Sequence, residues 1–171
     1  MRQFRKVNRW YDFNYSSNAT YFITICTKDR IAQFGKVSSN EMHYSNIGKI
    51  AVKHLAKLNE LFEDGELHIS QVMPNHIHLL YTLNNEEKDK FYLKQIKITE
   101  QRFKMIIPQR IKSFKTSVLK EIRNEGYESF NWQRSFHDHV VRDEESFKKI
   151  YWYIKNNPKN WAEDLYNPKN S

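Results

Sequence analysis

The chain is poor in residues that cross-link or interrupt a fold: its 171 residues include one cysteine, four glycines and four prolines. The single cysteine, Cys26, excludes an intramolecular disulfide framework and a zinc site built from cysteines. The scarcity of glycine and proline excludes collagen-like and proline-rich architectures. No apolar run approaches about 18 residues, so we expect no membrane span. Residues 1–15 lack the apolar core of a signal peptide, so we expect a cytoplasmic protein.

Positive charge is in excess, because 28 lysines and arginines outnumber 20 aspartates and glutamates and give a net charge of +8. Such an excess favours a polyanionic partner, although it does not indicate a fold. The length suits one domain with a full hydrophobic core. Hydrophobic residues at 39% and aromatic residues at 15% exclude a wholly disordered chain.

Hydrophobic periodicity and turn residues divide the chain into strands and helices. We predict strands over residues 21–27, 67–72, 76–82 and 136–141, helices over 47–62, 107–122 and 143–157, and a loop over 28–46. The order β-α-β-β-α-β, followed by a C-terminal helix, predicts an α+β, ferredoxin-like fold. In that fold one four-stranded antiparallel sheet carries two helices on one face. Many functions share this fold, so it does not decide the function.

Composition divides the chain into segments with different expected roles. We predict a basic N-terminal arm over residues 1–18, a folded domain over 19–160, a charged, mobile excursion within it over 83–105, and a C-terminal tail over 161–171. Arg5 and Lys6 lie in the basic arm. The sequence contains no internal repeat, so a repeat architecture is not expected.

Two histidines, His76 and His78, stand two positions apart on a predicted strand, so both imidazoles point to the same face. Side by side they can supply two ligands to a divalent metal and leave positions open for substrate oxygens. The same spacing also suits two ordinary half-buried histidines. His137 and His139 repeat it on the last strand, where we favour a polar end of the sheet that hydrogen-bonds or contacts DNA.

The C-terminal helix contains a second candidate group. At about 100° per residue, Tyr153 and Asn157 fall on the same side of the apolar stripe, one turn apart at the edge of the core. A tyrosine beside an amide at this spacing can place a phenol nucleophile next to a metal-bound group. The alternative is an amphipathic tyrosine that packs its ring and keeps its hydroxyl in water.

A third feature is the basic stretch of residues 97–124, in which eight basic residues occur with two acidic ones. Arg110, Lys112 and Lys115 lie off the apolar stripe of the predicted helix. Such a surface can follow the phosphates of a nucleic acid. It can equally be the solvated side of a surface helix, and only the overall positive charge favours nucleic acid.

Several motifs occur in order over about residues 20–160. The first resembles the histidine–hydrophobic–histidine motif of the Y1 single-strand transposases and reads Met73-Pro-Asn-His-Ile-His-Leu-Leu80. Others are similar to the subgroup called REP-associated tyrosine transposases, namely Ile111-Lys-Ser-Phe-Lys-Thr116, Trp132-Gln-Arg-Ser-Phe-His-Asp-His139 and Arg142-Asp-Glu144. The tyrosine-helix signature of that subgroup resembles Tyr153-Ile-Lys-Asn-Asn-Pro158.

This resemblance implies an HUH-type endonuclease domain, usually dimeric, that nicks and rejoins single-stranded DNA next to an imperfect palindrome folded as a hairpin. It implies that His76 and His78 bind Mg²⁺ or Mn²⁺. Asn157 is then the third ligand, with the adjacent Asn156 as the alternative. Tyr153 is then the nucleophile that forms a 5′-phosphotyrosine. Insertion-sequence transposases typically have glutamine at the place of Asn157, so the amide here is one methylene shorter.

The predicted partner is therefore single-stranded DNA with a hairpin, bound by a homodimer. We expect DNA contacts from Arg110, Lys112, Lys115, Arg134, His137, Arg5 and Lys6. Two other functions stay open. One is a catalytically silent DNA-binding module on the same sheet. The other is a metal-dependent phosphodiesterase that uses activated water, with Tyr153 in a structural role. An RNA-recognition domain is not favoured, because no glycine stands in the expected basic-glycine-aromatic strand signature.

Overall fold

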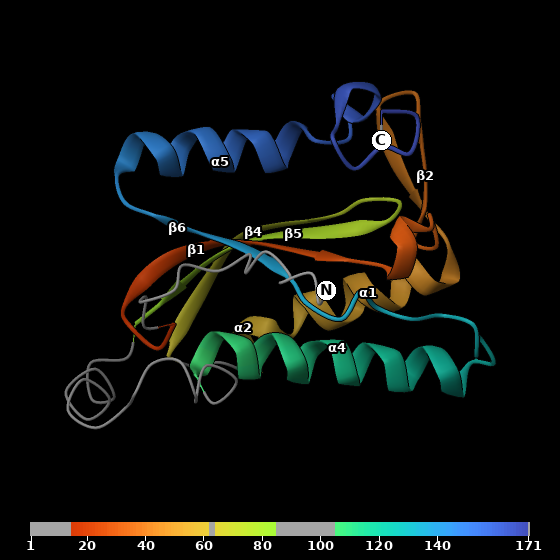
Figure 1. The fold of residues 1–171 in the computed structure, drawn as a ribbon, viewed down its shortest axis with the longest axis horizontal. Coiled ribbons are helices and arrows are strands. Elements are labelled where there is room, and N and C mark those ends of the chain that lie inside the picture. Colours follow the sequence, from red (N-terminus) through yellow and green to blue (C-terminus); the bar gives the residue numbers. More distant parts are fainter. Residues whose placement is uncertain (1–14, 62–63, 85–104, 171) are drawn as a thin grey trace, which may run out of the picture.

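One antiparallel sheet forms the centre of a computed structural model that describes residues 15–61, 64–84 and 105–170 (Figure 1). Its strands are β1 (Ala19–Cys26), β4 (Gly65–Val72), β5 (His76–Leu83) and β6 (His137–Val141), in the order β4-β5-β1-β6. All neighbouring pairs are antiparallel. This arrangement confirms the predicted ferredoxin-like sheet. Residues 1–14 of the basic arm, which include Arg5 and Lys6, and residues 85–104 of the charged excursion lie outside the described residues.

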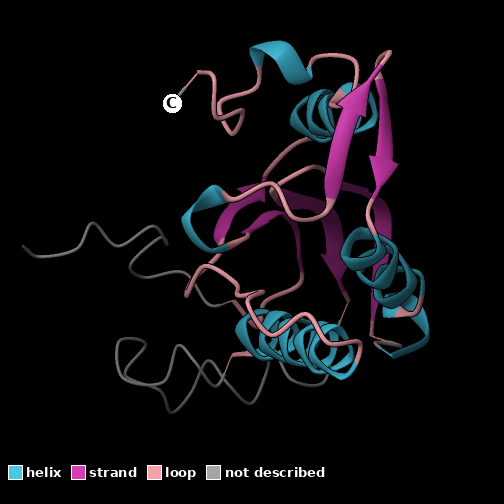
Figure 2. Cartoon of the chain, turned by 90° about the vertical axis from the view of Figure 1, so that its right-hand side faces the viewer, coloured by secondary structure: helices cyan, strands magenta, loops and turns pink. Residues whose placement is uncertain are grey.

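The helices cover the sheet on both faces. Helices α1 (Asn46–Ala56) and α4 (Ile106–Asn124) lie together on one face, and α5 (Glu144–Asn156) lies on the other. Figure 2 shows the same layers from the side, with α5 and the C-terminal loops across the sheet from the two other long helices. The helix predicted over residues 47–62 is divided at Lys57, and the short α2 (Leu58–Leu61) follows it.

Local sequence explains where helices α1 and α5 begin. The side chain of Ser45 caps α1 by accepting a hydrogen bond from the backbone N–H of Gly48. Asp143 caps α5 in the same way through Ser146, and the acids that follow suit the positive end of that helix. The apolar stripe of α5 then fixes which of its residues face the sheet.

Strand β5 has one face in the hydrophobic core and the other on the opposite side of the sheet. Its odd-numbered residues Ile77, Leu79 and Tyr81 are buried in the core with residues of α1 and α4. Because side chains alternate along a strand, His76 and His78 point to the opposite face, under α5. Both faces of β5 are therefore buried, one in the hydrophobic core and the other, with the two histidines, away from it.

Residues 28–46 correct one prediction, because the expected loop contains a hairpin. Strands β2 (Gly35–Ser38) and β3 (Glu41–Tyr44) pair with each other, after the short 3-10 turn η1 (Lys28–Arg30). Ser39 and Asn40 make the turn with φ of 51° and 64°, which is the left-handed geometry of a tight hairpin. Four-residue strands are too short to show a sustained alternation, so the sequence pattern did not reveal them.

Residues 161–170 were expected to be a tail and are folded in the structure. The 3-10 turn η3 (Trp161–Glu163) follows α5, and the chain then runs back over the end of β5, where the carbonyl of Tyr166 accepts a hydrogen bond from Asn75. In the part of the chain that the structure describes, no helix is long and apolar enough to cross a membrane.

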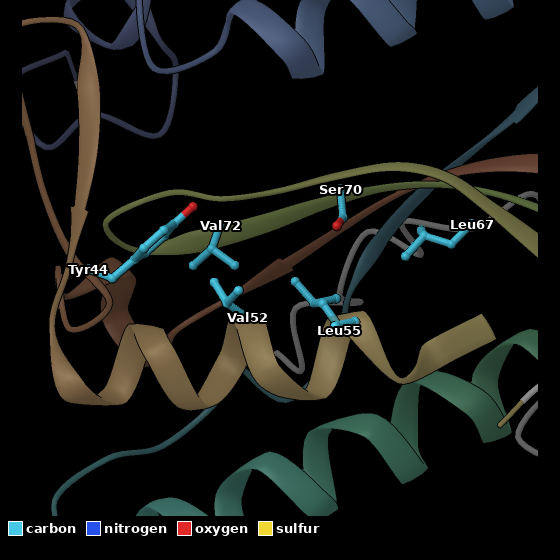
Figure 3. Close-up of a pocket in the computed structure, with 7 residues that line it drawn as sticks. Tyr44, Val52, Leu55, Leu67, Ser70 and Val72 are labelled. Carbon is cyan, nitrogen blue, oxygen red and sulfur yellow. The ribbon is translucent and has the colours of Figure 1, made fainter. Parts of the chain in front are cut away.

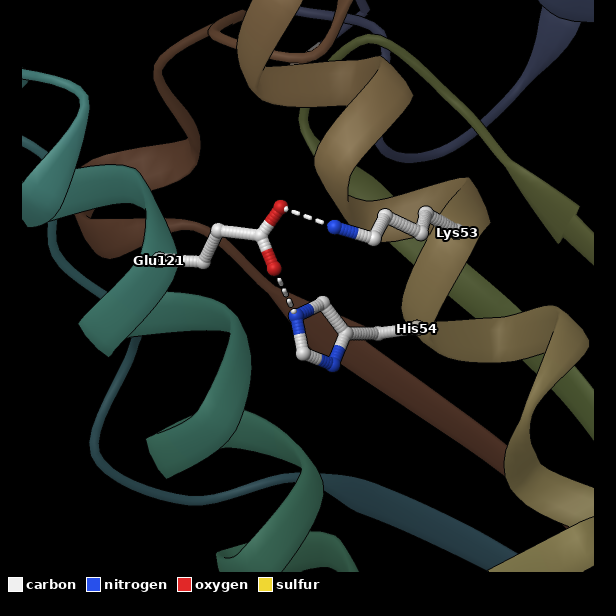
Figure 4. Close-up of polar contacts among 3 residues, drawn as sticks. All are labelled: Lys53, His54 and Glu121. Atoms are coloured by element: carbon white, nitrogen blue, oxygen red, sulfur yellow. Dashed lines mark hydrogen bonds and ion pairs between the residues drawn. The ribbon is translucent and has the colours of Figure 1, made fainter.

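A surface contact joins the two helices under the sheet (Figure 4). Glu121 of α4 accepts from Nζ of Lys53 at 2.7 Å and contacts Nε2 of His54 at 2.9 Å, both on α1. The hydrogen bond from Lys53 is the main cause that lowers the pKa of Glu121 below its ordinary value of 4.5.

We predict that Glu121→Gln lowers the free energy of unfolding by about 0.5 kcal/mol at pH 7, the usual size for an exposed ion pair. A carboxylate with a lowered pKa stabilises the fold above its ordinary pKa and loses that effect as the pH falls through the folded value. The difference from wild type should therefore vanish in strong acid. Urea unfolding at several pH values measures it, with the exposed Glu128→Gln as control. An equal loss at all pH values would contradict the prediction.

Candidate active site

The two histidines of β5 lie in direct contact. His76 and His78 are almost fully buried, and their Nε2 atoms are 3.0 Å apart. Each ring also has a polar partner at Nδ1: the side-chain oxygen of Asn75 for His76, at 2.9 Å, and the hydroxyl of Thr24 for His78, at 2.9 Å. Every ring nitrogen of the pair therefore faces a polar atom of the protein.

The hydrogen bonds of Asn75 assign the proton of His76. The Asn75 amide nitrogen donates to the carbonyl oxygens of Arg30 at 3.0 Å and Tyr166 at 2.7 Å. Its oxygen is left to accept, so Nδ1 of His76 carries a proton and Nε2 carries a lone pair. The contact between the two Nε2 atoms then requires the proton of His78 on Nε2, with Thr24 donating to Nδ1.

Burial keeps both rings neutral. It lowers the pKa of His76 to about 3, with a further contribution from the charge of Arg30, and the Asn157 side chain partly opposes the shift. Burial also lowers the pKa of His78 well below its ordinary value, assisted by His76 and opposed by Asp164. Neutral imidazole is the form that binds metal ions, so both rings have the charge state of a metal ligand at neutral pH.

Helix α5 places Tyr153 over this pair. The hydroxyl of Tyr153 lies 3.3 Å from Nε2 of His78 and donates to Oδ2 of Asp164 at 3.1 Å. The edge of its ring meets Phe22, with ring centres 6.0 Å apart, while 39% of the residue stays exposed. Burial and the charge of Asp164 raise the pKa of Tyr153, so the phenol is protonated at neutral pH.

The structure brings Asn157, and not Asn156, to the histidines. Asn157 is fully buried, and its amide nitrogen donates to Oδ2 of Asp164 at 2.6 Å. Its Oδ1 has no hydrogen-bond partner among the described residues. The side chain of Asn156 instead donates to the backbone carbonyl of Trp152 on its own helix, at 2.9 Å.

Asp164 is a site residue that the sequence analysis missed. It follows η3 and is buried, and one of its carboxylate oxygens lies within 4.8 Å of a ring nitrogen of His76 and of His78. Its other oxygen accepts from the backbone N–H of Tyr166 at 2.7 Å, a local turn typical of aspartate. In the sequence, Glu163 and Asp164 are the only acidic residues after Glu145. Their position in an otherwise basic C-terminal stretch was the one feature that could have drawn attention to Asp164.

The predicted DNA-binding residues on α4 lie away from the histidines. Helix α4, which carries Arg110, Lys112 and Lys115, lies on the opposite face of the sheet. Arg110 donates to Asp64 and to the hydroxyl of Tyr81, and burial lowers its pKa to about 10. Its guanidinium thus takes part in a network inside the protein.

The remaining basic candidates are more accessible or are held by backbone groups. Lys112 and Arg134 are exposed. Lys115 donates to the carbonyl oxygens of Gln133 and Ser135. His137 pairs with Thr24 across β6 and β1, and its ring centre is 6.5 Å from that of Tyr166. It therefore lies on the same face as the buried histidine pair.

A separate cavity of about 270 Å³ lies between α1 and β4 (Figure 3). Val52 and Leu55 line it from the helix, and Leu67 and Val72 line it from the strand. No histidine or acid is among its lining residues, and it lies on the helix-covered core face of the sheet. It is therefore distinct from the group around His76 and His78.

Comparisons with known proteins agree with the motif analysis, although no family model matches the chain. An uncharacterised Haemophilus influenzae protein is 29% identical over 164 residues, which cover 94% of this chain and 91% of that protein. A predicted REP-associated tyrosine transposase of the same organism is 28% identical over 148 residues, which cover 86% of this chain and 74% of that protein.

Two solved structures share the fold. One is a REP-associated tyrosine transposase bound to a REP hairpin, with a TM-score of 0.57 and 18% identity over 95% of this chain and 75% of that chain. The other is a predicted transposase from Deinococcus radiodurans, with a TM-score of 0.50 and 16% identity over 86% of this chain and 97% of that chain. Sequence and fold together confirm that this chain resembles the REP-associated tyrosine transposases.

Proposed function

We propose that the chain is a metal-dependent endonuclease and strand transferase that cuts and rejoins single-stranded DNA beside hairpin-forming palindromes, with Tyr153 as nucleophile. The contact of 3.3 Å between the Tyr153 hydroxyl and Nε2 of His78 carries the proposal. It joins the tyrosine motif and the histidine motif at one buried point. Similarity to a predicted REP-associated tyrosine transposase supports the same reaction class.

Mg²⁺ or Mn²⁺ is the proposed cofactor, held by His76, His78 and Asn157. The donors fit such an ion: two neutral imidazoles have their Nε2 atoms 3.0 Å apart, and the buried Oδ1 of Asn157 has no hydrogen-bond partner among the described residues. Thr24 can donate or accept, so His78 can move its proton to Nδ1 and free the lone pair of Nε2. When bound, the ion neutralises charge on the non-bridging oxygens of the phosphate.

Tyr153 supplies the covalent step in this proposal. Its hydroxyl oxygen attacks the phosphorus, a bond forms between them, and the bond from phosphorus to the 3′ oxygen breaks. The phenol proton leaves, and the 3′ oxygen gains one and becomes a free hydroxyl. The product is a 5′-phosphotyrosine that retains a phosphodiester bond, so a 3′-hydroxyl can reverse the step and rejoin strands without ATP.

The proposed partner, single-stranded DNA with a hairpin, lies over the face formed by α5 and β6. Tyr153 is partly exposed there, and His137 and the exposed His139 are on the same face. Arg134 and the arm residues Arg5 and Lys6 would contact flanking phosphates, whereas Lys112 of α4 lies across the sheet from this face. The resemblance also predicts a homodimer, although Tyr153 and His78 already meet within one chain.

Asn75 is expected to be a structural support of this site. Asn75→Ala leaves the Nδ1 proton of His76 without an acceptor and two carbonyls without a donor, so we predict a loss of about 1–3 kcal/mol in the free energy of unfolding. Urea unfolding measures it. The control is Asn131→Ala, because that side chain makes only an exposed contact with the carbonyl of Ser129. Equal stabilities of the two variants would contradict the assigned network.

Covalent chemistry depends on the hydroxyl of Tyr153. We predict that Tyr153→Phe abolishes the protein–DNA adduct and retains binding of single-stranded hairpin DNA, because the ring packing survives. Denaturing gel electrophoresis with labelled DNA and Mn²⁺ detects the adduct. Tyr151→Phe, on the same helix, should behave like wild type. Cleavage that continues in Tyr153→Phe would favour activated water, and binding without cleavage in the wild type would favour a silent DNA-binding module.

Metal-dependent cleavage requires the buried histidines. We predict that His76→Ala or His78→Ala reduces nicking to the level seen with EDTA, while His137→Ala still nicks DNA and binds it more weakly. The exposed His43→Ala is the control for a general effect of removing an imidazole. Nicking is measured at saturating Mn²⁺, and circular dichroism checks the fold. Normal nicking by His76→Ala would refute the ligand assignment.

A further inference from the structure

The proposed ligands leave the metal site without a negative charge. The side chains of His76, His78 and Asn157 offer two imidazole nitrogens and an amide oxygen, and none of these groups carries negative charge. One carboxylate, that of Asp164, joins the two histidines in the group of potential ligands found among the described residues. We propose that Asp164 is the anionic ligand of the metal, so that residues 161–170 complete the metal centre. This inference rests on the proposed function.

The backbone holds the carboxylate of Asp164 in one orientation. Oδ1 accepts from the N–H of Tyr166 at 2.7 Å. Oδ2 is thereby turned toward the site, where Asn157 donates to it at 2.6 Å and Tyr153 at 3.1 Å. The ligand atoms of His76, His78 and Asp164 all lie within 4.8 Å of one another, close enough for small side-chain adjustments to bring them around one ion.

The charge of Asp164 lacks a cationic partner in the described part of the chain. The residue is 6% exposed, and none of the ion pairs found there involves it. The side chain of Arg30 lies nearby but stacks on the ring of Tyr166, with the guanidinium carbon 4.9 Å from the ring centre. Buried carboxylates are normally paired with a cation or bound to a metal, so a divalent ion would supply what this site lacks.

Asp164 also determines how Asn157 presents its amide. A carboxylate can only accept, so the amide nitrogen of Asn157 turns to Asp164 and the oxygen is left without a partner among the described residues. That oxygen is the atom proposed as a ligand. Two imidazoles with one carboxylate and one amide oxygen form a mixed set, in which the oxygen donors are of the kind that suits Mg²⁺ and Mn²⁺.

Binding of Mn²⁺ to the full chain, without DNA, tests the inference. The electron paramagnetic resonance signal of free Mn²⁺ reports the unbound ion during a titration. We expect Asp164→Asn, which keeps the size and the acceptor oxygen of the side chain, to weaken Mn²⁺ binding by more than the roughly 10–100-fold that the loss of an outer-shell partner costs. Glu163→Gln removes the same charge from the adjacent, exposed position and should bind like wild type. His76→Ala should lose the binding.

The outcomes separate this inference from the proposed function. If Asp164→Asn binds Mn²⁺ like wild type and His76→Ala does not, Asp164 only orients its neighbours; the inference is then wrong and the histidine site stands. If His76→Ala also binds like wild type, the proposed metal site itself is wrong. Should Asp164→Asn fail to fold, a crystal of the wild-type chain soaked in MnCl₂ decides, since a ligand oxygen lies about 2.0–2.2 Å from the ion.

Discussion

The amide of Asn75 is fully buried and makes hydrogen bonds to three parts of the chain, and the candidate site depends on all of them. It joins the turn before β5 to the carbonyl of Arg30 after β1, to Tyr166 in the C-terminal segment, and to the ring of His76. Because the two donor contacts fix which end of the amide faces His76, the tautomer of that ring follows from the backbone of two distant segments. Folding thereby leaves the lone pair on Nε2 of His76, the atom proposed as a ligand.

The sheet keeps this polar cluster apart from the hydrophobic core. On β5 one face carries Ile77 and Leu79, which pack under α1, and the other carries the two histidines under α5. A shift of one residue in register would exchange the faces and bury apolar side chains among polar ones. The packing of the core therefore fixes the register of β5, and the register keeps both imidazoles on the face opposite the core.

Regular periodicity explains which parts of the fold and site could be predicted. The alternation of β5 placed His76 and His78 on one face, and the helical spacing of α5 placed Tyr153 and Asn157 on one side. The hairpin over residues 35–44 escaped prediction because each strand has four residues. Asp164 escaped because it stands in the loop directly after a 3-10 turn, where no period relates it to another residue. Its role depends on a long-range contact, and such contacts leave no local pattern.

The charges of the groups at the site also limit what the site can bind. A buried site tolerates little net charge, since each uncompensated charge loses its hydration. With neutral histidines, a neutral amide and a protonated tyrosine, Asp164 is the single negative group that the described residues contribute. A divalent cation would leave an excess of one positive charge, which matches the one negative charge of a phosphodiester. The composition of the site is thus suited to hold an ion and a DNA phosphate together, and the ion alone would remain incompletely neutralised.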